Sequence, residues 1–176
     1  CERPANTTKP LHIKTKPGQT ERYSGGGYLI IQLLIEDVTG TDFSEFVTNV
    51  IFKPLGMSNT TYDYRPDVNQ KAKIASGNRG TGRPLRNKRY HIYPERGAAG
   101  PWSTASDIAK LVIELQKEYY NESELILNKT LISGMFSPQI NNKGLGVNLK
   151  GLAHPEAFWH AGQNLGYTGL FYGLIN

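Results

Sequence analysis

The stretch from Arg22 to Gly27 reads RYSGGG, and it places the phenol of Tyr23 beside a serine and three glycines. A nearly continuous apolar run from Tyr28 to Ile35 follows. A turn into a buried helix explains the glycines and the apolar run, but it does not explain the tyrosine. A phenol with a pKa near ~10 is a poor base unless cationic neighbours favour the phenolate. Tyr23 is therefore either a candidate for acid–base chemistry or a structural tyrosine at a helix start.

The histidines form no metal-binding pattern. They stand at positions 12, 91, 154 and 160, and the sequence contains neither His-Glu-x-x-His nor Cys-x-x-Cys. Cys1 is the only cysteine, so no internal disulfide can form. The triple glycine lacks the preceding strand of a dinucleotide fingerprint, and GNRGTGR at 77–83 lacks the Gly-Lys-Ser/Thr ending of a phosphate-binding loop. No metal and no cofactor are therefore expected, and there is no Gly-x-Ser-x-Gly elbow either.

Two helices are predicted directly after the glycines. The first runs from about residue 28 to 38, is expected to be buried nearly all round, and ends in a left-handed cap at Gly40. The second begins at Asp42 and must end near Lys53, because Pro54 disfavours helix in the residue before it. Its expected inner stripe is Phe43, Phe46, Val47 and Val50.

Further along the chain, Thr104 with Asp107 three residues later indicates the start of a third helix. A short helix is expected near 129–136, capped by Asn128. After Pro138, short apolar and aromatic runs between glycines predict two or three antiparallel strands. The fold class is therefore α+β. The predicted organisation is a helical lobe over 1–137, with a long basic loop region at 58–101, and a partial antiparallel sheet over 138–176, together one incomplete domain.

The net charge of +5 is concentrated in one region. Residues 65–96 contain nine Lys or Arg residues against two acidic ones, an excess of seven positive charges. A solvated basic loop is the simpler interpretation, and a patch for an anionic partner is the alternative. Single-strand recognition would need interleaved aromatic residues, of which this region offers only Tyr90 and Tyr93, so no nucleic acid partner is expected. No apolar run approaches the ~20 residues of a membrane span.

Five stretches, in order, resemble the serine hydrolase family that contains class C β-lactamases, D-Ala-D-Ala peptidases and related esterases. They are KPGQTERYSGGGYLIIQLLIEDVTG (16–40), IFKPLGM (51–57), YPERGAAGPWSTASDIAKL (93–111), GLGV (144–147) and FWHAGQNLGYTG (158–169). The resemblance implies a β-lactamase/transpeptidase-like fold. It also implies a periplasmic or extracellular location, which nothing else in the sequence addresses.

The resemblance assigns Tyr23 to the family's motif tyrosine, which relays a proton between the nucleophile and the leaving group. The family commonly has Tyr-x-Asn, whereas this chain has Gly25 at the third position, which offers the substrate only backbone. This departure argues against a dedicated β-lactamase. His160, Ala161 and Gly162 match the third motif. There His160 would hold negative charge or tune Tyr23, and the amide of Gln163 would donate to the oxyanion.

No serine in this chain has lysine three residues on, so the family's Ser-x-x-Lys nucleophile motif is absent. The chain is therefore expected to be an internal fragment that needs additional N- and C-terminal segments to complete the site. The expected function is part of a serine acyl hydrolase acting on a β-lactam, a D-amino-acid peptide or an ester. The alternative is a non-catalytic relative that binds peptidoglycan or a peptide in the same groove.

Overall fold

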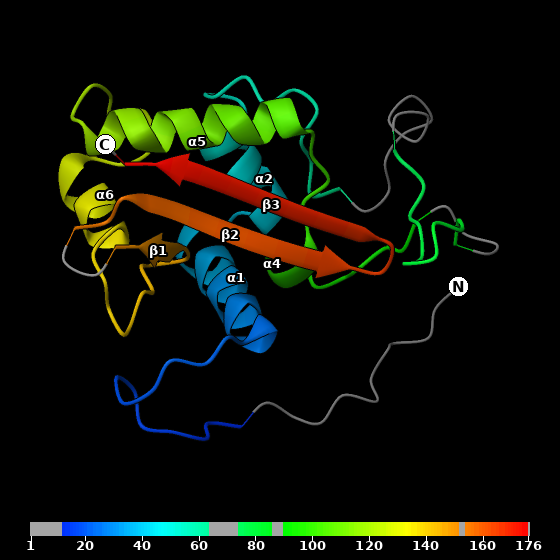
Figure 1. Ribbon diagram of the computed structural model, residues 1–176, viewed down its shortest axis with the longest axis horizontal. Coiled ribbons are helices and arrows are strands. Elements are labelled where there is room, and N and C mark those ends of the chain that lie inside the picture. The colour runs from blue at the N-terminus through cyan, green and yellow to red at the C-terminus, as the bar shows by residue number, and fades with distance from the viewer. Residues whose placement is uncertain (1–11, 64–73, 86–89, 152–153, 176) are drawn as a thin grey trace.

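The computed structural model describes residues 12–63, 74–85, 90–151 and 154–175. In chain order its elements are α1 (Gly25–Thr39), α2 (Phe43–Val47), the π-helix η1 (Thr48–Phe52), α4 (Arg96–Ala99), α5 (Ala105–Tyr119), α6 (Lys129–Met135), β1 (Asn148–Lys150), β2 (Ala157–Asn164) and β3 (Tyr167–Leu174). The helices precede an antiparallel sheet of order β1-β2-β3 (Figure 1). The α+β class predicted from the sequence is therefore confirmed.

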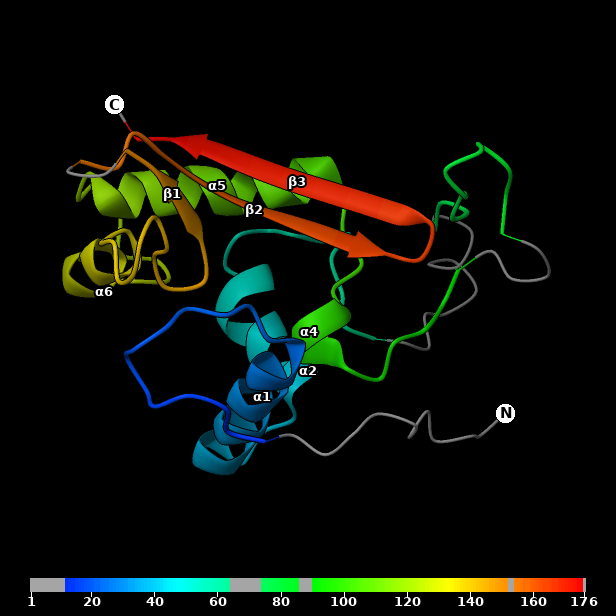
Figure 2. The same cartoon turned by 60° about the horizontal axis from the view of Figure 1, so that its bottom comes forward.

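The molecule has two apolar clusters, one on each side of α5. In the first, Phe158 of β2 stacks on Phe136 at 4.4 Å between ring centroids, so the sheet packs against the helices that cover one of its faces. The second cluster joins α2 and η1 through Phe43, Val47, Phe52 and Met57. Leu111 packs against both clusters, and Figure 2 shows α5 along the sheet with α1, α2 and α4 grouped below.

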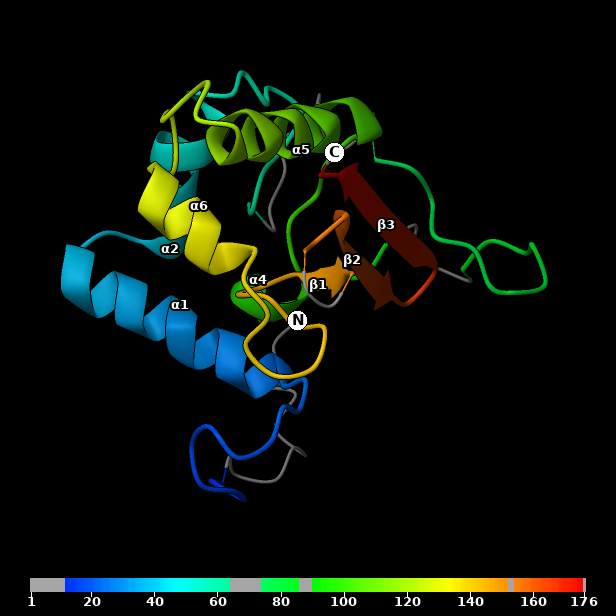
Figure 3. The same ribbon diagram turned by 60° about the vertical axis from the view of Figure 1, so that its left-hand side comes forward.

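The helix α1 ends where its sequence indicates, but it begins at Gly25, three residues before the predicted start. Ser24 is the N-cap and accepts from the Gly27 amide at 3.1 Å, and Gly40 takes φ 65° with its amide donating to the Glu36 carbonyl. The left-handed cap is thus confirmed. The expectation of burial all round is wrong, because none of the residues of α1 is buried and Leu33 and Val38 are 58 % and 75 % exposed. Among the described elements α1 contacts mainly α4 and, less extensively, α2, and it lies at the margin of the molecule (Figure 3).

The second predicted helix forms, but its second half has π-helical geometry. Asp42 caps α2 by accepting from the amides of Ser44 and Glu45, as predicted. From Thr48 the helix widens into η1, which adds residues per turn and changes the register of the inner face. Phe52 is therefore buried, and Val50, predicted to face inward, is 40 % exposed.

The helix α5 is tied to the preceding loop by a buried carboxylate. Thr104 caps the helix by accepting from the Asp107 amide at 3.2 Å, as the sequence indicates. The Asp107 side chain is 1 % exposed. Its carboxylate accepts hydrogen bonds from the Asn59 amide at 2.8 Å and from the Thr60 hydroxyl at 3.0 Å. It also forms an ion pair with Lys110 at 2.9 Å. Burial by itself would raise the pKa of Asp107, but these hydrogen bonds and the charge of Lys110 outweigh it and hold the pKa below its usual value.

We predict that Asp107→Asn lowers the free energy of unfolding by about 2 kcal/mol at pH 7, since buried donors lose a charged acceptor. A lowered pKa in the folded state gives stability that is present above the unfolded pKa of ~3.9 and is lost as the pH falls through the folded pKa. The deficit of the variant should therefore shrink below about pH 4. Urea unfolding at pH 3 and pH 7 measures this. The exposed Asp37→Asn is the control, and a deficit that is the same at both pH values contradicts the prediction.

Candidate active site

A cleft of about 1160 Å³ lies between the β2–β3 hairpin and the segment that leads into α5. The chain just before α1 contributes Tyr23, and β2 contributes its second half. The other side is formed by the end of α4, by Trp102 and by the first turns of α5. The cleft therefore draws on segments that are far apart in the sequence.

The structure brings four of the five predicted site residues to this cleft. Tyr23 and His160 face each other with 6.3 Å between ring centroids, and Gly162 and Gln163 line the cleft on the same strand. Gly25 is not among the described residues that line the cleft. It is the first residue of α1 and faces α4, since a Cβ built on it would lie 3.6 Å from the Cβ of Ala98. The catalytic and binding roles of all five stay predictions.

The ring of Tyr23 lies beside two other rings, those of Tyr28 and His160, but most of the residue is exposed. Its side chain is 63 % exposed, and its ring lies 6.0 Å from that of Tyr28. Burial, with a smaller contribution from Tyr23, raises the pKa of Tyr28 above its ordinary value. On the opposite side, His160 stacks on Phe171 at 6.3 Å. The phenol and the imidazole thus meet at an open place where a ligand can reach both.

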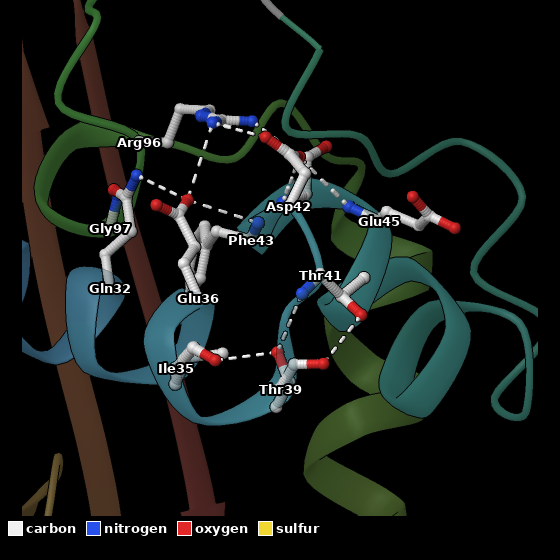
Figure 4. A network of polar contacts seen from close by, with 11 residues as sticks. Gln32, Ile35, Glu36, Thr39, Thr41, Asp42, Phe43, Glu45, Arg96 and Gly97 are labelled. Carbon is white, nitrogen blue, oxygen red and sulfur yellow. Dashed lines mark hydrogen bonds and ion pairs between the residues drawn. The ribbon is translucent and has the colours of Figure 1, made fainter.

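An ion-pair network holds α4 against α1 and α2 (Figure 4). Arg96 donates two parallel hydrogen bonds to Asp42, at 2.9 and 2.8 Å, and its guanidinium lies 3.7 Å from Glu36. The hydrogen bond and charge of Arg96, assisted by the amides of α2, hold the pKa of Asp42 below its usual value. Bidentate pairing with a planar guanidinium gives geometric specificity as well as energy. It therefore fixes the position of the first residue of α4.

The next residue of α4 is fixed by α1 directly. The Gly97 amide donates to the side-chain oxygen of Gln32 at 3.0 Å, and Gln32 also donates to Glu36 at 3.2 Å (Figure 4). A Cβ at Gly97 would lie 3.0 Å from the Tyr28 carbonyl oxygen, closer than most Cβ contacts, so glycine favours this close approach of the two helices.

The far end of α4 is joined to the sheet. Asn164, the last residue of β2, donates to the Ala99 carbonyl at 2.7 Å, and the Leu165 amide donates to the Tyr93 hydroxyl at 3.1 Å. In consequence one short helix, α4, contacts the start of α1 and the end of β2. Tyr23 lies two residues before α1, and His160 lies on β2.

Sequence reasoning missed α4, because this helix falls in the region 58–101 that was predicted to be a loop, and it gave no place in the site to the aromatic residues around α4. Trp102 meets Tyr90 at 5.4 Å and Tyr167 at 5.5 Å, in both cases edge to face, and Tyr62 stacks on Phe52 at 5.7 Å. Burial raises the pKa of Tyr62 to about 12. The density of tyrosine and tryptophan between 62 and 102 was the available signal.

Most of the basic residues counted between 65 and 96 lie outside the described residues. Of those described, Arg79 and Arg83 do not line the cleft and Arg96 does. In the described part of the chain, no cluster of three or more His, Cys, Asp or Glu side chains is arranged to hold a metal ion. No helix among the described residues is long and apolar enough to cross a membrane.

The arrangement defines a class of protein, an α+β fold in which a tyrosine from the helical part meets a histidine from a sheet strand across an open cleft. The Beta-lactamase family model matches residues 5–176, and the chain belongs to that family. Membership supports a serine-hydrolase type of function in general terms.

Three proteins illustrate the similarity. The chain is 32 % identical over 136 residues to beta-lactamase-like protein 4 of Dictyostelium discoideum, a match that covers 70 % of this chain and 23 % of that protein. The octameric penicillin-binding protein homologue of Pyrococcus abyssi superposes with a TM-score of 0.72 at 25 % identity, over 92 % of this chain and 37 % of the other. The penicillin-binding protein of Bacillus halodurans superposes with a TM-score of 0.74 at 22 % identity, over 92 % of this chain and 49 % of the other. The chain spans 21 % to 43 % of the length of the curated relatives that it matches.

We predict that Arg96→Gln raises the pKa of Asp42 toward its ordinary value near ~3.9, because the guanidinium is the first cause of the lowered pKa. An NMR titration of the side-chain carboxyl carbon measures the change. Arg79→Gln is the matched control, since Arg79 lies outside this network, and it should leave the Asp42 titration unchanged. An unaltered Asp42 pKa in Arg96→Gln contradicts the assignment.

Proposed function

We propose that this chain forms part of a serine acyl hydrolase that works through an acyl-enzyme on a β-lactam, a D-amino-acid peptide or an ester. The observation that carries the proposal is the meeting of Tyr23 and His160, at 6.3 Å, in the cleft of a Beta-lactamase family member. No Ser-x-x-Lys occurs among the 176 residues, so the nucleophile is proposed to come from residues outside them.

In the proposed reaction a serine oxygen bonds to the acyl carbon of the substrate while the bond to the leaving group breaks. Tyr23 takes the proton of the serine and passes it to the leaving group. The Gln163 amide, on the strand of His160, is the proposed donor to the developing oxyanion, and His160 is proposed to tune Tyr23. Water then adds to the acyl-enzyme, releasing the acid and restoring the serine hydroxyl.

A second candidate, a non-catalytic relative that binds peptidoglycan or a peptide, is favoured by the same absence of Ser-x-x-Lys. Intact mass after treatment with a fluorophosphonate distinguishes the two. In a longer protein that contains this chain, the acyl hydrolase should be labelled once, at a serine with lysine three residues on, while the 176-residue chain should stay unlabelled. Labelling of this chain places the nucleophile within it. An unlabelled longer protein favours the binding relative.

We predict that Tyr23→Phe in the longer protein lowers kcat by ~100-fold or more, the size typical of losing a positioned acid–base group. Its Tm should stay nearly unchanged, because the tyrosine is 63 % exposed. Steady-state hydrolysis and thermal unfolding measure the two effects. Tyr120→Phe, on the exposed surface outside the cleft, is the control. A large loss of stability with activity retained means that Tyr23 is structural.

A further inference from the structure

The hairpin of residues 77–85 lies beyond the β2–β3 turn in both Figure 1 and Figure 2. Its base is anchored to that turn, since the Asn78 amide donates to the Gly166 carbonyl at 3.0 Å. Gly77 and Gly166 approach so closely that a Cβ built on Gly166 would lie 2.8 Å from the Gly77 α-carbon. A Cβ built on Gly77 would in turn lie 2.9 Å from the ring of Tyr167. The hairpin is therefore held in place against the end of the sheet.

The register of this hairpin places two arginines directly opposite each other. Asn78 and Pro84 form an antiparallel bridge. Arg79 and Arg83 are the next pair toward the turn, and the Arg79 amide donates to the Arg83 carbonyl at 2.8 Å. The turn is closed by Gly82, whose amide donates to the Arg79 carbonyl at 2.8 Å and whose φ is 75°. Since opposite residues of an antiparallel pair project from the same face with Cβ atoms about 5 Å apart, the two arginine side chains leave the hairpin side by side.

These two arginines have no neutralising partner in the described part of the chain. The ion pairs found there are formed by Arg96 and Lys110, and both Arg79 and Arg83 are exposed. In the sequence itself, residues 68–94 contain seven Lys or Arg and no Asp or Glu. Like charges directly opposite each other in an antiparallel pair are destabilising. An anion placed between the two guanidinium groups would relieve this repulsion, which favours the binding of an anion here.

A pair of guanidinium groups suits phosphate better than carboxylate. One guanidinium is enough to satisfy both oxygens of a carboxylate through two parallel hydrogen bonds. A phosphate monoester presents three acceptor oxygens and a charge of about −1.5 to −2 at pH 7, so it can accept from two guanidinium groups at once. The residues between the arginines, Gly80, Thr81 and Gly82, carry no large side chain that would cover the pair.

We propose that Arg79 and Arg83 form a binding site for a phosphate monoester, with one guanidinium on each side of the phosphate group. The site is distinct from the cleft, because neither arginine lines it. Its ligand is defined by the phosphate group, which either a small soluble ester or the headgroup of phosphatidic acid supplies.

An NMR titration of the 176-residue chain with glycerol 3-phosphate tests the site, because the side-chain Nε–H signals of Arg79 and Arg83 report on it directly. Both signals should shift, and glycerol 3-phosphate should bind at least tenfold more tightly than acetate at the same ionic strength. Equal affinity for acetate, or signals that do not shift, overturns the proposal.

Two variants separate a two-arginine site from general attraction to positive charge. Arg79→Lys keeps the charge but loses the planar donor fork, so it should weaken glycerol 3-phosphate at least fivefold, as followed by the Arg83 signal. Lys117→Gln removes one positive charge from the exposed side of α5 and should leave the affinity unchanged. Because these positions are exposed, both variants should keep the circular dichroism spectrum of the parent chain. Unchanged binding by Arg79→Lys, or an equal loss in Lys117→Gln, contradicts the assignment.

Sedimentation with lipid vesicles distinguishes the two sources of the phosphate group. Binding to phosphatidylcholine vesicles that contain phosphatidic acid, lost when Arg79 and Arg83 are both changed to Gln, identifies the lipid headgroup. Binding of glycerol 3-phosphate without vesicle binding identifies a small soluble ester. Phosphatidylglycerol, a phosphodiester lipid, is the control, and equal binding to vesicles that contain it overturns a site for the monoester.

Discussion

The bidentate pairing of Arg96 with Asp42 is the contact on which the cleft depends. A helix of four residues makes too few internal hydrogen bonds to hold itself in place, so α4 needs outside partners. Arg96 supplies two of them through Asp42, and Gly97 supplies a third through Gln32. Once α4 is fixed, its last carbonyl is available to Asn164 at the end of β2.

A second anchor acts on the other wall. Asp107 binds the loop after Met57 to the first turn of α5 and is almost completely buried. Since Leu111, one turn further on, packs against both apolar clusters, α5 links the sheet to the helical group. The cleft lies between these two anchored walls, and for this reason its aromatic lining has defined orientations.

Positive charge is concentrated in one region of the sequence, while the described part of the cleft has one Lys or Arg side chain. The excess of positive charge lies between residues 65 and 96, yet the one charged side chain of the described cleft is bound by two acids. Among the described basic residues of this region, Arg79 and Arg83 lie outside the cleft and Arg96 lines it.

The sequence by itself determined the local structure and the family motifs. Gly40 ends α1, Asp42 and Thr104 begin their helices, and the short apolar and aromatic runs after Pro138 form the strands, because capping and strand signals depend on neighbours a few residues apart. Only the tertiary structure decided which faces are covered. It exposed Leu33, moved burial from Val50 to Phe52, and turned part of a presumed loop into α4. It also showed that Arg96 is occupied by Asp42, a pairing across distant segments that depends on the packing of whole helices.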